Sequence, residues 1–114
     1  MKETKKESNR SGFANAVTEE MEDIITLDEY LIENKESAYM LRVETDSMND
    51  AGILRGDLII VDRGATPKNG DIIVALVDGH YRLQYFDKKT LLRQGFAGQV
   101  QIEAVVKSVI RKYK

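Results

Sequence analysis

The fold of this chain is decided by residues 70–86, which read GDIIVALVDGHYRLQYF. Two apolar runs, Asp71–Val77 and Tyr81–Phe86, flank the dipeptide Asp78-Gly79. Aspartate-glycine between two such runs is a strong signal for a two-residue turn, because glycine adopts positive φ without a steric penalty. The stretch is therefore predicted to form a β-hairpin.

Outward from this hairpin, most of the chain has the alternation or the short apolar runs that are typical of strands. The further strands expected are Ala38–Glu44, Leu58–Asp62, Thr90–Arg93 and Ile102–Tyr113. One stretch differs, because Leu27, Tyr30 and Leu31 fall on one helical face. Thr26 can cap this face, so a short helix is predicted over Thr26–Asn34. The body is thus predicted to be mainly β with one short N-terminal helix.

The composition limits the class of protein. The 114 residues, 42% of them hydrophobic and 32% charged, suit a single ordinary domain. The chain has no cysteine and only His80 as histidine, so disulfides, a cysteine nucleophile and a zinc cluster are not expected, and neither is a cofactor. The formal net charge of -2 gives no sign of direct DNA binding, and no apolar run is long enough to span a membrane.

The N-terminal residues are polar and without apolar periodicity. They carry Lys2, Lys5, Lys6 and Arg10. Residues 1–12 are predicted to form a flexible arm ahead of one domain at residues 13–114. The arm lacks the apolar stretch of a secretory signal, so export is not expected and a cytoplasmic location is predicted.

The segment most suited to chemistry is Thr45–Ile53, which reads TDSMNDAGI and follows a predicted strand. It is polar, rich in turn residues, and carries Ser47 beside Met48. Taken alone, this pair is more typical of a turn serine that hydrogen-bonds its own backbone. A serine hydroxyl becomes a nucleophile only when a base takes its proton. The chain has no Ser/His/Asp signature, so the usual alternative is a desolvated, neutral lysine on a neighbouring strand.

Four motifs follow one another at characteristic spacings: Asp46-Ser47-Met48, Gly52-Ile53, Gly56–Asp62 and Gly70–Val74. In order and spacing they resemble the LexA/UmuD family of self-cleaving serine-lysine peptidases, and its UmuD-like members in particular. The resemblance runs from about Gly12 to Arg111. It implies a fold of curled sheets like those of LexA and signal peptidase, with Ser47 as the nucleophile and Met48 at the oxyanion or substrate pocket. It also implies self-cleavage of the arm at Ser11-Gly12, although the family more often has cysteine or alanine before that glycine.

One departure from the family pattern concerns the general base. Relative to the Asp78-Gly79 turn, the position of the family's catalytic lysine falls on Gln84. A glutamine amide cannot accept a proton near neutral pH, so cleavage is predicted to be lost or very slow. Lys88 and Lys89 are nearby in sequence, but four residues of strand span about 13 Å, so both are interpreted as turn residues. A slip of one residue in the comparison brings no lysine to this position. The sequence leaves open whether Gln84 is natural or a deliberate change.

Several other residues have a simpler interpretation. Met48 either shapes the pocket or packs in the core. Asp57 and Asp71 precede strands and are interpreted as turn acceptors rather than acid/base groups. His80 is expected to be an exposed hairpin residue. The arginines show no aromatic interleaving and are interpreted as scattered: Arg42, Arg55, Arg82, Arg93 and Arg111.

The resemblance implies a UmuD-like protein of the SOS response to DNA damage. Such a protein is a homodimer, is cleaved when it meets a RecA-nucleoprotein filament, and then joins a UmuC-like Y-family polymerase in translesion synthesis. The alternative is a non-catalytic dimerisation domain of a LexA-like or phage-type repressor, which needs a DNA-binding helix-turn-helix ahead of it. A signal peptidase is not expected without a membrane anchor. The strand Ile102–Tyr113 is either an exposed edge available for dimerisation or an internal strand.

Overall fold

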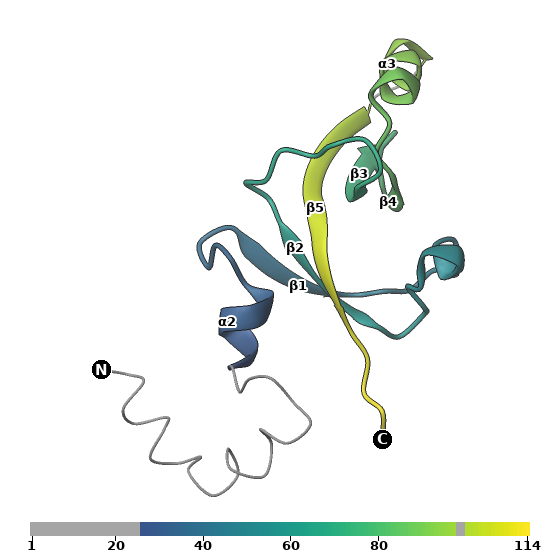
Figure 1. The fold of residues 1–114 in the computed structure, drawn as a ribbon. Coiled ribbons are helices and arrows are strands. Elements are labelled where there is room, and N and C mark those ends of the chain that lie inside the picture. Colours follow the sequence, from purple (N-terminus) through teal and green to yellow (C-terminus); the bar gives the residue numbers. More distant parts are fainter. Residues whose placement is uncertain (1–25, 98–99) are drawn as a thin grey trace, which may run out of the picture. The chain divides into compact units, whose positions relative to one another are not determined.

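The computed structural model describes residues 26–97 and 100–114, in which the backbone forms a five-stranded antiparallel sheet (Figure 1). Its strands are β1 (Ala38–Arg42), β2 (Leu58–Asp62), β3 (Ile72–Val77), β4 (His80–Tyr85) and β5 (Val100–Ile110). The helical elements are α2 (Leu27–Leu31), the 3-10 helix η1 (Asn49–Ala51) and α3 (Lys88–Ala97). The prediction of a mainly β fold is confirmed. Residues 31–114 form one compact unit. The boundary predicted after residue 12 lies outside the described residues.

The C-terminal strand β5 lies at the centre of the sheet, whose strand order is β1-β2-β5-β3-β4. Residues 105–110 of β5 pair with β2, and residues 100–105 pair with β3. Each of these ladders contains one register shift, and such irregularities bend a strand. The long curve of β5 is visible in Figure 1. Of the two possibilities left open by the sequence, β5 is therefore the internal strand and not an edge of the sheet.

The hairpin of β3 and β4 has the predicted two-residue turn. Val77 pairs with His80 at the closed end, and Asp78 and Gly79 have φ angles of 49° and 83°. Positive φ at both central positions is the geometry of a type I′ turn, which matches the twist of the two strands. His80 is exposed, as predicted.

The segment Thr90–Arg93 belongs to α3, so the prediction of a strand there was wrong. The Asp87 carboxylate caps the helix, because its Oδ2 accepts hydrogen bonds from Thr90 N at 3.3 Å and from Thr90 Oγ1 at 2.6 Å. Leu91 N donates to Asp87 O at 2.9 Å, which closes the first turn. Two adjacent leucines are compatible with either a helix or a strand, and the Asp87 cap favours the helix at this position.

The helix predicted over Thr26–Asn34 is present as the shorter α2. Its first turn is a capping box, in which Glu29 N donates to Thr26 Oγ1 and Thr26 N donates to Glu29 Oε1. Within residues 26–97 and 100–114, no helix has the length and apolar character needed to cross a membrane.

Buried side chains lie in two clusters, because successive residues of a strand point to opposite faces of the sheet. The first cluster contains Val43, Met48, Ile53, Ile59, Val61, Val74 and Ala104. The second contains Ile73, Ala75 and Val105, and Leu91 of α3 packs against it. The two faces of β3 are thus covered by different parts of the chain, the serine-bearing segment on one and α3 on the other.

Ile73 is completely buried, and its truncation tests this packing. We expect Ile73→Ala to lower the free energy of unfolding by about 3 kcal/mol, because it leaves a cavity at the centre of the sheet. Ile102→Ala is the matched control, since Ile102 is 43% exposed on the neighbouring strand, and it should cost less than about 1 kcal/mol. Urea denaturation measures both values. Equal losses would contradict the assignment of Ile73 to the core.

Candidate active site

Ser47 lies in a tight turn between β1 and η1 and is exposed. Its backbone N–H donates to Thr45 Oγ1 at 3.1 Å. The turn continues through Asn49 N, which donates to Asp46 O. It closes on the carbonyl of Met48, which accepts from Ala51 N at 3.0 Å and from Ile53 N at 3.2 Å. These bonds fix the backbone on the C-terminal side of the serine.

The serine turn opens onto a groove of about 550 Å³. Apolar and polar residues from four strands and from the segment after β1 line it: Leu41, Arg42, Val43, Glu44, Thr45, Ser47, Ile59, Val74, Tyr81, Arg82, Leu83 and Gln84. The four residues 81–84 are consecutive in β4. Consecutive side chains of a strand point to opposite faces, so these four residues cannot all line the groove from one face. The groove therefore borders one face of β4 and also its outer edge. Mixed apolar and polar lining of this kind suits an extended peptide.

Ser47 and Gln84, the predicted nucleophile and the position of the family's base, are both among the residues that line this groove. Gln84 is half-buried and pairs with Ile73 of β3. Among the described residues that line the groove there is no lysine. Lys88 and Lys89 begin α3 and are outside the lining, and they belong to a helix rather than to the predicted turn.

Met48 is 4% exposed and packs in the first cluster. Its side chain is not part of the groove lining, so of the two interpretations the structure shows core packing. The Met48 N–H takes no part in the backbone hydrogen bonds that form the turn. Ser11 and Gly12, the predicted cleavage site, lie outside the described residues.

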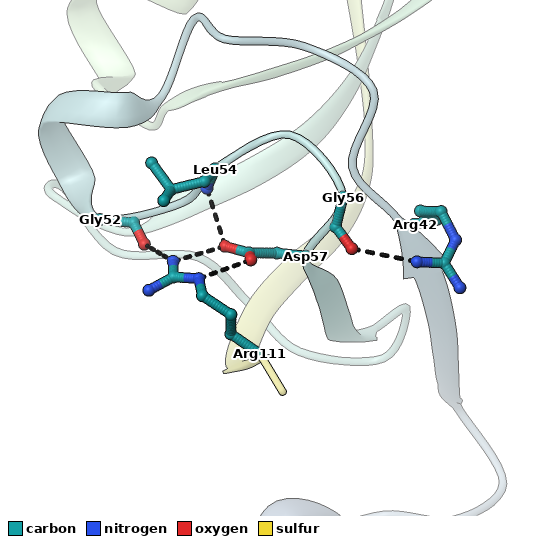
Figure 2. Close-up of polar contacts among 6 residues, drawn as sticks. All are labelled: Arg42, Gly52, Leu54, Gly56, Asp57 and Arg111. Atoms are coloured by element: carbon teal, nitrogen blue, oxygen red, sulfur yellow. Dashed lines mark hydrogen bonds and ion pairs between the residues drawn. The ribbon is translucent and has the colours of Figure 1, made fainter. Parts of the chain in front are cut away.

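Asp57 and Arg111 form an ion pair near the serine turn (Figure 2). Asp57 is 3% exposed, and its two oxygens accept hydrogen bonds from Arg111 Nε at 2.7 Å and Nη2 at 2.6 Å. Arg111 Nη2 also donates to Gly52 O at 2.8 Å, and Leu54 N donates to Asp57 Oδ2 at 2.7 Å. The hydrogen bonds from Arg111 and Leu54 lower the pKa of Asp57 to about 2.

Two further arginines hold the same part of the chain. Arg42 donates to Gly56 O at 3.0 Å, as Figure 2 shows, and Arg55 donates to Glu44 O at 2.8 Å and to the Asp46 carboxylate. Sequence reasoning missed this arrangement and interpreted the arginines as scattered. No local signal reveals it, because Arg111 is 54 residues from Asp57 in the chain.

Two simpler predictions agree with the geometry. The Asp71 carboxylate accepts from Lys68 N at 2.8 Å, which is a turn contact, and Asp57 likewise accepts from Leu54 N. Over the described ranges 26–97 and 100–114, no group of three or more histidine or acidic side chains is placed to hold a metal ion.

The mainly β fold and the serine turn beside a groove agree with the class that the sequence comparison gives. The model of the Peptidase S24-like family matches residues 8–93. The chain therefore belongs to the Peptidase S24-like family, and its resemblance to the LexA/UmuD proteins is confirmed.

Individual relatives give the same assignment. The chain is 37% identical over 84 residues to Protein ImpA of Salmonella typhimurium, covering 74% of this chain and 55% of ImpA. It is 40% identical over 79 residues to the LexA repressor of Clostridium kluyveri, covering 69% of this chain and 39% of that repressor. With the LexA repressor of Caldicellulosiruptor saccharolyticus it is 47% identical over 72 residues, or 63% of this chain and 35% of that repressor. The chain thus spans about half the length of ImpA and less than that of the repressors.

The lowered pKa of Asp57 predicts how stability depends on pH. Its folded-state pKa, about 2, is below the ordinary value of 3.8. The charged pair with Arg111 therefore contributes its full stability above about pH 4, and this contribution is lost as the pH falls to about 2. We expect Asp57→Asn to be less stable than the parent at neutral pH, with a difference that shrinks between about pH 4 and pH 2. Urea denaturation at several pH values measures it. Asp46→Asn, which removes an exposed pair, should change stability little, and a pH-independent loss in Asp57→Asn would contradict the assignment.

Proposed function

We propose that this chain is a UmuD-like protein of the SOS response, built to cleave its own arm at Ser11-Gly12 and to act as an accessory subunit of an error-prone translesion polymerase. The observation that carries the proposal is the position of Ser47 and Gln84 in one groove of a Peptidase S24-like domain. A homodimer, a RecA-nucleoprotein filament and a UmuC-like Y-family polymerase are the proposed partners. The proposed location is the cytoplasm.

In the proposed reaction, Ser47 Oγ attacks the carbonyl carbon of Ser11. The bond from Ser11 to the nitrogen of Gly12 breaks, Gly12 leaves as a new amino terminus, and water then hydrolyses the ester on Ser47. The Met48 N–H, which the turn leaves out of its own hydrogen bonds, can donate to the developing oxyanion. The proton of Ser47 needs an acceptor, which the Gln84 amide cannot provide, so the present chain is proposed to cleave slowly or not at all.

The proposed homodimer has support in the pairing of β5. Only residues 105–110 pair with β2, and only residues 100–105 pair with β3. Beyond Val105 the edge of β5 that faces away from β2 therefore has no strand partner among the described residues. Such a half-free edge can pair with its copy across a two-fold axis.

A second candidate function is the non-catalytic dimerisation domain of a LexA-like or phage-type repressor. The observation that favours it is Gln84, together with the 40–47% identity to LexA repressors over 79 and 72 residues. In this case the groove binds a peptide segment without cleaving it.

The two proposed functions predict different results when a lysine replaces Gln84. We expect Gln84→Lys to remove residues 1–11 on incubation, at a rate that rises with pH as the lysine loses its proton. The rate should exceed that of the parent by at least about a hundredfold, the usual contribution of a general base. Intact-mass measurement between pH 7 and pH 10 follows the reaction.

Two controls make the result specific. Gln84→Lys combined with Ser47→Ala removes the nucleophile and should stay whole. Gln84→Arg adds a cation that does not act as a base, so it should also stay whole. If folded Gln84→Lys remains intact at every pH, self-processing is abandoned and the binding domain becomes the better assignment.

A further inference from the structure

Arg111 lies directly after β5, outside the groove, yet its guanidinium reaches the loop that follows the serine turn. We propose that Arg111 is a positioning residue for Ser47, acting through its hydrogen bond to the Gly52 carbonyl. This inference rests on the proposed function in one respect only, that Ser47 is the reacting residue.

The contacts form a short path from Arg111 to the serine. Arg111 Nη2 donates to Gly52 O at 2.8 Å, and Gly52 N donates to Asn49 O at 3.0 Å. Gly52 ends η1 with a φ of 85°, a conformation that glycine adopts readily. Asn49 in turn donates through its backbone N–H to Asp46 O, on the other side of the serine. A shift of Gly52 is therefore transmitted to both sides of Ser47.

The Arg111 guanidinium binds two acceptors, the Asp57 carboxylate and the Gly52 carbonyl, and the two contacts have different roles. The two bonds to Asp57 neutralise a carboxylate that is 3% exposed, which is a structural role. The bond to Gly52 O, in contrast, holds the end of η1 (Figure 2). Asp57 does not depend on Arg111 alone to stay in its loop, because Leu54 N also donates to it.

The path also excludes a direct role in the reaction. Arg111 is not among the residues that line the groove, and its guanidinium binds Asp57 and the Gly52 carbonyl instead. Its influence on the serine must therefore pass through the backbone of residues 48–52.

Lysine separates the two roles, because it keeps the positive charge but lacks the flat fork of donors that binds two acceptors at once. In Arg111→Lys we expect the melting temperature to stay within a few degrees of the parent, since Asp57 keeps a cation. Hydrogen exchange at the amides of Ala51, Gly52 and Ile53 should become about tenfold faster, because the charge-assisted hydrogen bond from Arg111 to Gly52 O is lost. In the Gln84→Lys background, cleavage should slow by a similar factor.

Arg63→Lys is the matched control. Arg63 also bonds through Nη2, to Glu103 of β5 at 3.1 Å, and is similarly exposed. It should alter neither exchange in the serine turn nor cleavage.

The proposal is overturned if Arg111→Lys leaves exchange at residues 51–53 unchanged. It is also overturned if exchange rises by the same factor throughout the sheet, since that shows a general loss of stability. The exchange measurement uses the parent chain and needs no cleavage. If Gln84→Lys fails to cleave, the proposed function fails while exchange still decides the role of Arg111.

Discussion

The pairing of β5 with two strands at once is the constraint on which the rest of the structure depends. Val105 pairs with Asp62 on one side and with Ile73 on the other, so a single residue joins the two halves of the sheet. Without this strand, the β1-β2 pair and the β3-β4 hairpin are separate two-stranded ribbons, which are marginally stable in water. The groove depends on the same pairing, because β1 and its following segment supply one side and β4 supplies the other.

Arg111 connects this central strand to the serine turn. A carboxylate as buried as Asp57 is costly unless it is paired, and here one guanidinium and one backbone N–H satisfy it. Together with Arg42 and Arg55, Arg111 fixes the carbonyls of a segment that has little regular structure of its own. The loop around Ser47 is thus ordered by cations from three different parts of the chain.

The groove holds the serine of the family motif but, among its described lining residues, no lysine. Ser47 is exposed at its edge and the backbone N–H of Met48 takes no part in the hydrogen bonds of the turn, whereas position 84, which also lines the groove, is a glutamine. An amide can donate and accept hydrogen bonds, so it suits the binding of a peptide backbone better than the removal of a proton. Membership of a peptidase family and the absence of a basic side chain at position 84 are therefore compatible in one chain.

The sequence by itself determined the hairpin over residues 71–86, the strand Leu58–Asp62, the short helix after Thr26 and the serine motif, because local turn chemistry and alternation specify each of them. It misassigned Thr90–Arg93, where the Asp87 cap outweighs a weak apolar pattern. Only the tertiary structure decided that β5 is central, that Met48 packs in the core and that Arg111 binds Asp57. Contacts between residues 54 positions apart leave no periodic signal, since they arise only when a strand in the middle of the chain, β2, pairs with the C-terminal strand β5.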